Sequence, residues 1–274
     1  MARSREDKAK AFAARHLADD GPLVVPNPWD VGSARLFEHL GFEGLATTSS
    51  GLAGTRGRLD GRVERSAVLE HVAQIAAATD LPVSADLEDA YADDAAGVAE
   101  TFRLAVDAGL AGASVEDFTR RPDPKILPLA EAAERVRAAV DAVRGKGPFV
   151  VTARAENHLH GVDDLGDTIR RLQAYQEAGA DVLYAPGPTA ADDLRRIVAE
   201  VDRPVNAILR PGGPSVGQLG ALGIRRVSVG GALYWTGVAA VAAAAQQLRD
   251  EGTIDFRSVE AGARVGRAAY SSGD

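Results

Sequence analysis

Residues 82–89 read Pro-Val-Ser-Ala-Asp-Leu-Glu-Asp, a short apolar stretch that ends in three acidic side chains. In a β-strand alternate side chains share one face, so Asp86 and Glu88 are predicted to point the same way. Two carboxylates on one face repel each other unless a cation lies between them, and a set of oxygen ligands suits Mg²⁺ or Mn²⁺. The stretch therefore indicates a buried strand that carries a metal site. The alternative is that Asp86 or Asp89 only caps the helix that follows.

Seven further short apolar segments alternate with amphipathic segments along the 274 residues. The eight strands are expected at 23–26, 44–48, 82–89, 112–117, 149–154, 181–185, 204–208 and 226–229. The helices are expected at 4–19, 31–40, 65–79, 94–108, 129–144, 164–178, 191–201, 216–222 and 234–249, followed by a partly helical tail. The segment 49–54 consists of small residues and is expected to be a loop.

The alternation of strands and helices implies parallel pairing, and continuous apolar strands are typical of strands buried on both faces. Eight strand–helix units in a chain of this length predict an α/β fold, a single (β/α)8 barrel domain over residues 1–274 with extra C-terminal helices. The alternative, an open doubly wound sheet, needs a glycine-rich dinucleotide loop after the first strand. The sequence at 27–30 is Asn-Pro-Trp-Asp, which is not such a loop.

The composition argues against several classes of protein. A net charge of −8 and a pI near 5.2 argue against binding of nucleic acid or anionic membranes, and no apolar run reaches transmembrane length. The chain contains no cysteine, which excludes disulfides, thiolate metal sites and thiol nucleophiles. None of the lysines ends a predicted strand, so a Schiff-base mechanism is not expected. The polar start lacks a hydrophobic signal core, and a cytoplasmic protein is expected.

In a (β/α)8 barrel the catalytic side chains lie at the carboxyl ends of the strands. The candidate residues at the predicted ends are Trp29, Asp30, Ser49, Ser50, Asp86, Glu88, Glu116, Asp117, Arg154, Tyr184 and Asn206. Arg154 is expected either to bind a substrate carboxylate or to pair with Glu116. The backbone amides and the hydroxyl at 50–52 are expected to hold an anionic oxygen, although such small residues also form simple turns.

Three features outside the acidic strands have two interpretations each. His158 and His160 are either metal ligands or, more commonly for such a pair, solvated loop residues. The glycine pair at 230–231 is either a phosphate-binding turn or a tight turn before a helix. The loop at 118–128, which includes Lys125, either closes over the site as a lid or remains solvated.

The ordered motifs resemble those of the isocitrate lyase/phosphoenolpyruvate mutase superfamily over about residues 23–245. The matching segments are Asn-Pro-Trp-Asp-Val-Gly-Ser-Ala-Arg at 27–35, Thr-Ser-Ser-Gly-Leu-Ala at 48–53, Leu-Asp-Gly at 59–61, Val-Ser-Ala-Asp-Leu-Glu-Asp at 83–89, Ala-Ser-Val-Glu-Asp at 113–117 and Thr-Ala-Arg at 152–154. Together they are specific for the superfamily but not for one of its members.

The resemblance implies roles for individual residues. Asp86 is expected to be the direct ligand of Mg²⁺ (or Mn²⁺), with Glu88 and Glu116 as its partners. Asp60 is expected either to be a catalytic acid or to support the residues that contact the substrate without contacting it itself. Arg154 is expected to bind the 2-oxo acid. From the strand ends and the resemblance together, the expected substrate-binding residues are Trp29, Ser50, Gly51, Leu52, Asp86, Arg154 and Asn206. The expected catalytic residues are Asp60, Glu116 and Arg154.

The sequence departs from the lyases of this superfamily at 118–127, where Phe-Thr-Arg-Arg-Pro-Asp-Pro-Lys-Ile-Leu replaces a Lys-Lys/Arg-Cys-Gly-His loop. Without the acid thiol, isocitrate cleavage by the usual route is not expected. The expected activity is that of a Mg²⁺-dependent carbon–carbon lyase or decarboxylase on a small 2-oxo or 2-hydroxy di- or tricarboxylate such as oxaloacetate, through a metal-stabilised enolate. The alternatives are phosphonopyruvate hydrolase or phosphoenolpyruvate mutase chemistry, and a catalytically silent barrel that binds a 2-oxo acid.

The resemblance also implies a homodimer or a homotetramer. Tyr234 and Trp235 open an alanine-rich helix, and alanine-rich faces allow close packing against another helix. The region from about 234 to 274 is therefore expected to pack on a neighbouring subunit, in the manner of the swapped helices of this superfamily.

Overall fold

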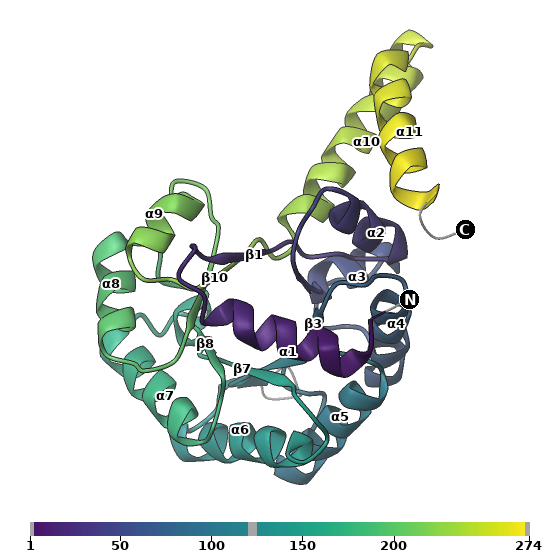
Figure 1. Ribbon diagram of the computed structural model, residues 1–274. Coiled ribbons are helices and arrows are strands. Elements are labelled where there is room, and N and C mark those ends of the chain that lie inside the picture. The colour runs from purple at the N-terminus through teal and green to yellow at the C-terminus, as the bar shows by residue number, and fades with distance from the viewer. Residues whose placement is uncertain (1–2, 120–124, 272–274) are drawn as a thin grey trace.

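Eight parallel strands form a barrel in the computed structural model, which describes residues 3–119 and 125–271. The strands pair in the order β1-β10-β9-β8-β7-β4-β3-β2, and every ladder between them is parallel. In Figure 1 the helices form a ring around these strands. The strands are β1 (Leu23–Val25), β2 (Leu45–Ala46), β3 (Val83–Asp86), β4 (Gly112–Glu116), β7 (Val150–Arg154), β8 (Val182–Tyr184), β9 (Val205–Ile208) and β10 (Arg226–Ser228).

The two ends of this strand order, β1 and β2, meet through two hydrogen bonds rather than a full ladder. The Ala46 N–H donates to the Pro26 carbonyl oxygen at 3.2 Å. The Asn27 side-chain Nδ2 donates to the Thr47 carbonyl oxygen at 3.1 Å. The barrel is therefore nearly closed, and the predicted (β/α)8 fold class is confirmed.

Helices follow the strands and cover the outside of the barrel (Figure 1). Several begin at a capping side chain: Asp94 before α5 and Asp164 before α7 each accept the backbone N–H three residues later. Behind the helices, side chains such as Leu172 and Leu183 are fully buried, and each such leucine contributes roughly 1.5–3 kcal/mol. The helices are α1 (Arg5–His16), α2 (Val31–His39), α3 (Ser49–Thr55), α4 (Arg65–Ala77), α5 (Ala95–Asp107), α6 (Leu129–Val143), α7 (Leu165–Glu177), α8 (Ala191–Ala199), α9 (Val216–Ala221), α10 (Ala232–Glu251) and α11 (Phe256–Tyr270), with a 3₁₀ turn, η1 (Asn157–His160).

The segment 49–54 is helical, so the prediction of a loop there is wrong. Thr48 Oγ1 accepts the Gly51 N–H at 3.2 Å and caps α3, and the Leu52 N–H donates to the Thr48 carbonyl oxygen at 3.0 Å. A capped first turn outweighs the low helix propensity of serine and glycine. As a result, the amides of Gly51 and Leu52 are used within the helix.

The strand β3 is shorter than predicted and ends at Asp86. Glu88, Ala90 and Tyr91 have backbone φ values of +50°, +61° and +53°, in the left-handed region that residues other than glycine seldom adopt. The alternation of strand side chains therefore stops at Asp86. Beyond the strand, Glu88 Oε1 accepts the Tyr91 O–H at 2.8 Å. The expectation that Asp86 and Glu88 share one strand face is wrong for this reason.

The helix α1 covers the amino-terminal end of the barrel (Figure 1). Phe12 is buried there with Val150 and Val182, the first residues of β7 and β8. His16 Nδ1 lies 2.6 Å from the Phe12 carbonyl oxygen and therefore carries the proton, which leaves Nε2 as an acceptor. Burial, together with the charge of Arg226, lowers the pKa of His16 to about 3. His16 is thus a neutral histidine in the folded protein at pH 7.

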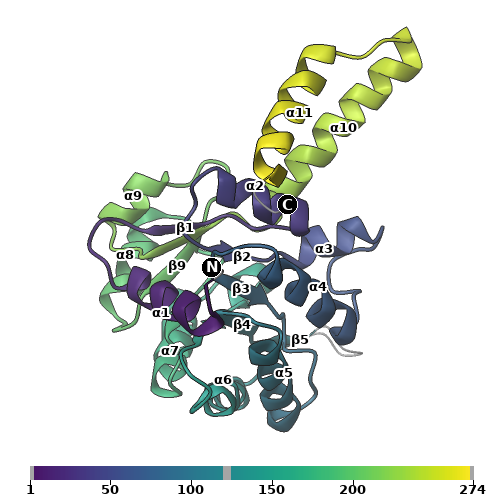
Figure 2. The ribbon, with the colours of Figure 1, turned by 45° about the vertical axis from the view of Figure 1, so that its right-hand side comes forward.

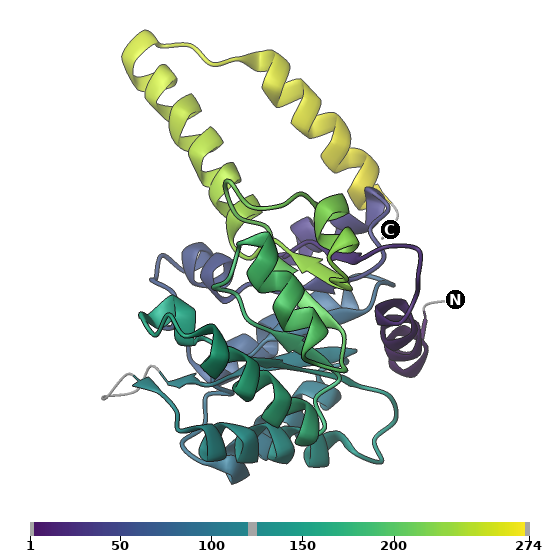
Figure 3. The ribbon, with the colours of Figure 1, turned by 90° about the vertical axis from the view of Figure 1, so that its left-hand side faces the viewer.

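The last two helices form an arm that projects from the barrel (Figures 2 and 3). The helix α10 buries no residue within the single chain, and α11 returns to contact α2, where Ala269 is buried. The large apolar side chains that the arm exposes include Trp235, Val241, Leu248, Phe256 and Val259. In the described ranges of the chain, no helix has both the length and the apolar character required to span a bilayer.

Replacement of His16 should flatten the loss of stability in acid. The folded-state pKa of about 3 is below the ordinary value of 6.5, so the stabilisation is present above pH 6.5 and is lost as the pH falls towards 3. Between pH 7 and pH 5 this histidine should remove about 2 kcal/mol from the free energy of unfolding. We expect urea denaturation to show a smaller acid loss for His16→Gln than for the control His39→Gln, an exposed site. Equal losses in the two variants would contradict the assignment.

Candidate active site

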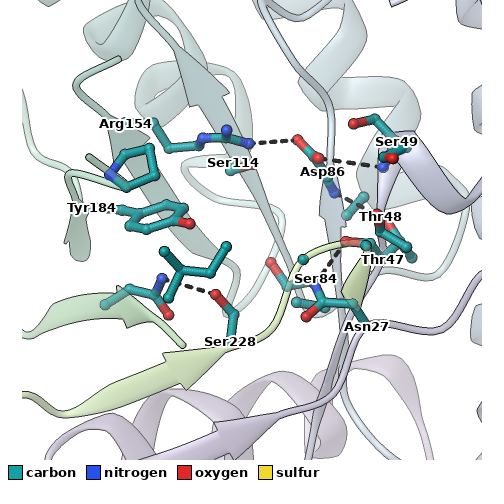
Figure 4. A pocket seen from close by; sticks show the side chains of 18 of the residues that line it. Asn27, Thr47, Thr48, Ser49, Ser84, Asp86, Ser114, Arg154, Tyr184 and Ser228 are labelled. Atoms are coloured by element: carbon teal, nitrogen blue, oxygen red, sulfur yellow. Dashed lines mark hydrogen bonds and ion pairs between the residues drawn. The ribbon is translucent and has the colours of Figure 1, made fainter. Parts of the chain in front are cut away.

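A cavity of about 170 Å³ opens at the carboxyl ends of the strands (Figure 4). Sites for drug-sized ligands span roughly 300–1,000 Å³, so this cavity suits a smaller metabolite. The predicted site residues that line it are Ser49, Ser50, Asp60, Asp86, Arg154, Tyr184 and Asn206. They belong to α3, the turn before α4, and the strands β3, β7, β8 and β9, so only the closed barrel brings them together.

Arg154, the last residue of β7, contacts three carboxylates. Its Nη1 lies 2.8 Å from Asp86 Oδ1, and its Nη2 lies 3.2 Å from Glu116 Oε2. Nε and Nη2 are each 2.9 Å from Glu156 Oε1. The guanidinium also lies 5.3 Å from the centroid of the Tyr184 ring. Figure 4 shows the contact between Arg154 and Asp86 at the edge of the cavity. Of the two roles expected for Arg154, the ion pair with Glu116 is therefore present.

Burial and neighbouring charges shift the pKa values of Glu116, Glu156 and Arg154. Burial raises the pKa of Glu116 well above its ordinary value, and it also raises the pKa of Glu156. Burial disfavours the charged form of Arg154, but the three carboxylates outweigh this effect and raise its pKa well above its usual range. The cluster has more acidic groups than cations, so it is a place where a further cation or a proton is stabilised.

A second group of hydrogen bonds holds the segment after β7 in place. Asp117 Oδ1 accepts the Glu156 N–H at 2.8 Å. Asp117 Oδ2 accepts the Tyr175 O–H at 2.6 Å and the Arg171 Nη1 at 3.0 Å. Because Glu156 contacts Arg154 directly, Asp117 positions the arginine cluster without lining the cavity.

Asp86 is held from both sides. Its Oδ1 faces Arg154, and its Oδ2 lies 3.4 Å from the Ser49 N–H. Its own backbone N–H donates to Thr47 Oγ1 at 3.0 Å. The Asp86 side chain is 17 % exposed, whereas that of Glu116 is 1 % exposed. Asp86 is therefore the acidic member of this cluster that the cavity can reach.

Seven of the predicted site residues do not line the cavity: Trp29, Asp30, Gly51, Leu52, Glu88, Glu116 and Asp117. The Gly51 and Leu52 amides are used inside α3, so the expected backbone contact with an anionic oxygen is left to Ser50. Trp29 packs against aromatic rings of α2 and α10. Glu116 lies behind Arg154, and Glu88 is turned towards Tyr91.

Other residues that line or support the cavity were not predicted: Glu156, Arg210, Arg226 and Ser228. Three of them follow a pattern that the sequence does contain. Arg226 and Ser228 are two residues apart in a short apolar strand, and Glu156 lies two residues after Arg154, the last residue of β7. Polar residues with a period of two in a buried strand face the barrel interior. Arg210 follows β9 in a loop and carries no such signal.

The charged side chains that line the cavity are cationic in balance. Among the described residues, they comprise three arginines, Arg154, Arg210 and Arg226, and two aspartates, Asp60 and Asp86. Among the described residues that line the cavity there is no lysine that could form a Schiff base. The lining therefore suits an anionic ligand that reacts without a covalent amine.

The loops around the cavity resolve some of the open interpretations. His158 Nδ1 lies 2.7 Å from Asp163 Oδ1, and the His160 ring stacks on Phe118 with centroids 3.4 Å apart. In the described ranges, no group of three or more His, Cys, Asp or Glu side chains is arranged to hold a metal ion. Lys125 lies in β6 (Lys125–Ile126), which pairs with β5 (Phe118–Thr119) in an antiparallel hairpin. The rest of the expected lid, 120–124, lies outside the described residues.

The fold and the site define a (β/α)8 barrel with an arginine–carboxylate cluster at the carboxyl ends of its strands. The chain belongs to the phosphoenolpyruvate phosphomutase family, whose family model matches residues 12–249. This match, together with its lyase relatives, confirms the expected isocitrate lyase/phosphoenolpyruvate mutase superfamily.

Three relatives illustrate the range of this superfamily. 2-Methylisocitrate lyase of Escherichia coli is 31 % identical over 212 residues, which cover 74 % of this chain and 70 % of that protein. Oxaloacetate decarboxylase of Bradyrhizobium sp. strain BTAi1 is 32 % identical over 209 residues, which cover 73 % of this chain and 70 % of that protein. The crystal structure of a Burkholderia cenocepacia J2315 protein, provisionally described as a lyase/mutase, is 49 % identical, with a TM-score of 0.89, and the match covers 93 % of this chain and 92 % of that chain.

Removal of the guanidinium from the cluster should destabilise the fold. Arg154→Met leaves buried carboxylates without their cation, and breaking a buried ion pair from one side costs about 3–5 kcal/mol. We expect a loss of that size in urea denaturation at pH 7. The control is Arg103→Met, which breaks an exposed ion pair with Glu100 and should change stability by less than about 1 kcal/mol. Similar small losses in both variants would show that Arg154 does not hold the cluster together.

Proposed function

We propose that this chain is a Mg²⁺-dependent carbon–carbon lyase or decarboxylase that acts on a small 2-oxo dicarboxylate such as oxaloacetate. The observation that carries the proposal is the cavity, in which three arginines and two aspartates surround about 170 Å³ at the carboxyl ends of the strands. Arg210 and Arg226 line the cavity and form no ion pair among the described residues, so they favour a small ligand with more than one negative charge. The similarity to an oxaloacetate decarboxylase supports this choice of substrate class.

The residues at the cavity mouth fit a divalent cation. Proteins usually hold Mg²⁺ by one or two carboxylates, with water and substrate oxygens as the other ligands. Asp86 is the carboxylate of the cluster that lines the cavity, and the acidic groups around Arg154 outnumber its single charge. We propose Asp86 as the direct ligand, with Glu116 acting from behind it. Besides burial, the charge of Glu88 contributes to the raised pKa of Glu116, so Glu88 remains a proposed partner in this set.

Bound Mg²⁺ would supply a Lewis acid that withdraws electrons from the 2-oxo group. Arg154 holds the Asp86 carboxylate through Nη1, and the hydroxyl of Ser50 borders the same cavity. Decarboxylation of oxaloacetate breaks the C3–C4 bond and releases CO₂. The electron pair of that bond remains in the enolate of pyruvate, which then takes a proton at C3. This bond cleavage needs neither a thiol acid nor an amine, which agrees with a chain that has no cysteine.

Turnover of oxaloacetate tests this proposal. We expect Mg²⁺-dependent release of pyruvate that is abolished by a chelator and reduced at least about tenfold in Asp86→Asn, because one ligand charge is lost. Calorimetry should show weaker Mg²⁺ binding in the same variant. Asp107→Asn removes one exposed acidic charge from α5 and serves as the matched control.

Other products would support the alternatives. Robust glyoxylate release from isocitrate without activity on oxaloacetate would contradict the proposal. Release of phosphate from phosphonopyruvate would favour phosphorus–carbon chemistry. If oxaloacetate binds together with Mg²⁺ but decays no faster than it does without the protein, the chain is a catalytically silent barrel.

We further propose that the arm formed by α10 and α11 packs on a neighbouring copy of this chain, giving a homodimer or a homotetramer. The support is that α10 buries nothing within one chain, although it carries Trp235, Val238 and Val241. A row of large apolar side chains exposed on one arm is typical of a surface that another protein covers. A second copy is the occupant that we propose, because the arm extends away from its own barrel (Figure 2).

A charge placed on the arm should disrupt this assembly. Val241 is 70 % exposed in the single chain, so Val241→Arg leaves the monomer fold intact while it places a charge in the proposed contact. We expect light scattering at micromolar concentration to show a smaller assembly for this variant and for a chain that ends before Thr253. The control Val162→Arg changes an exposed valine beside η1 and should keep the wild-type mass. A monomeric wild-type protein would overturn the proposal.

A further inference from the structure

Arg226 is a buried cation that borders the cavity. It is 4 % exposed and is the first residue of β10, and the strand registers align it through Asn206 and Tyr184 with Arg154. Its Nε donates to Asn206 Oδ1 at 2.8 Å, and its Nη1 lies 3.5 Å from His16 Nε2. Both partners are neutral, since one is an amide and the other a histidine that keeps a free lone pair at Nε2.

Arg226 forms no ion pair with a carboxylate in the described ranges of the chain. Burial lowers the pKa of Arg226 to about 10, which leaves the guanidinium charged at pH 7. Two other buried arginines, Arg154 and Arg171, each contact carboxylates. A buried cation without a counter-charge is unfavourable unless something else supplies an anion.

The neighbours of Arg226 orient its guanidinium towards the cavity. Asn206 is its direct partner in the pairing of β9 with β10, and Asn206 Nδ2 donates in turn to Ser228 Oγ at 3.2 Å. Among the described residues, Nη2 of Arg226 forms no hydrogen bond, while Nε is used by Asn206. Figure 4 shows Ser228 on the side of the cavity opposite the pair of Asp86 and Arg154. The cavity thus has a polar group at each end.

We propose that Arg226 binds the second carboxylate of the substrate, at the end of the cavity away from Asp86, and so selects dicarboxylates over monocarboxylates. The inference rests on the proposed function, because it takes the ligand to be a dicarboxylate. Arg154 is less suited to this role since its N–H groups already face Asp86, Glu116 and Glu156. Arg210 is exposed at the mouth, where water weakens its attraction for an anion.

Binding of two stable acids tests the assignment. Calorimetry in the presence of Mg²⁺ would compare malonate, with two carboxylates, and pyruvate, with one. We expect wild type to bind malonate more tightly, and Arg226→Met to weaken malonate binding at least about tenfold while pyruvate changes less than about threefold. Arg225→Met is the matched control, because Arg225 is the preceding residue, loses the same charge and pairs with Asp19 outside the barrel. Its malonate affinity should stay at the wild-type level.

Thermal stability separates binding from a structural role. Without ligand, Arg226→Met should melt no lower than Arg225→Met, since a buried unpaired charge is removed, and added malonate should stabilise it less than wild type. Arg226→Lys keeps the charge and should retain the preference for malonate, which keeps the test decisive if the methionine variant does not fold. A wild type without this preference, or a folded Arg226→Met variant that retains it, overturns the inference.

The binding result does not depend on turnover, because neither acid is decarboxylated here. Suppose that Arg226→Met loses the malonate preference while the wild-type protein leaves oxaloacetate unchanged. This result would support the carboxylate site and contradict the proposed reaction. Active decarboxylation with an unaltered preference in Arg226→Met would support the reaction and contradict the role of Arg226. The two failures are therefore distinguishable.

Discussion

The ion-pair cluster around Arg154 is the interaction on which the site depends. Asp86, Glu116 and Glu156 come from the end of β3, the end of β4 and the segment after β7, and one guanidinium contacts all three. Buried carboxylates repel each other and lose hydration, so these strand ends can converge only where a cation is placed among them. The cluster thereby sets the spacing of three strand ends, and Asp86 is left at the surface of the cavity.

The barrel interior is unusually polar for this fold. Interiors of (β/α)8 barrels are mostly filled by layers of branched apolar side chains. Here Ser84, Ser114, Asn206, Arg226 and Ser228 line the cavity instead, and short or planar polar side chains leave space between the strands. Stability must then come mainly from the apolar layer between strands and helices, where Leu172 and Tyr175 are fully buried. Separation of the two layers lets the cavity carry unfavourable groups such as an unpaired arginine.

The arm and the cavity are physically connected. The Trp235 Nε1 donates to Ser50 Oγ at 3.2 Å, and Ser50 lines the cavity. Gly54 of α3 lies so close to the Tyr234 ring that a Cβ there would stand 2.4 Å from the Tyr234 hydroxyl oxygen. The first turn of α10 therefore packs directly on the helix that forms part of the cavity wall. A movement of the arm would therefore be transmitted directly to α3, without any intervening loop.

The sequence by itself determined the eight strands, the barrel and the acidic and arginine-bearing strand ends, because strand alternation and turn residues are local and Asp86 and Arg154 each end a strand. The superfamily also followed from ordered motifs in the chain. Only the tertiary structure decided that β3 stops before Glu88, that a cap on Thr48 turns 49–54 into a helix, and that one guanidinium serves three carboxylates. These outcomes depend on partners far apart in the chain, whose distances no local pattern encodes. The same holds for Arg226, whose lack of an acidic partner becomes visible only when β9, β10 and α1 are placed together.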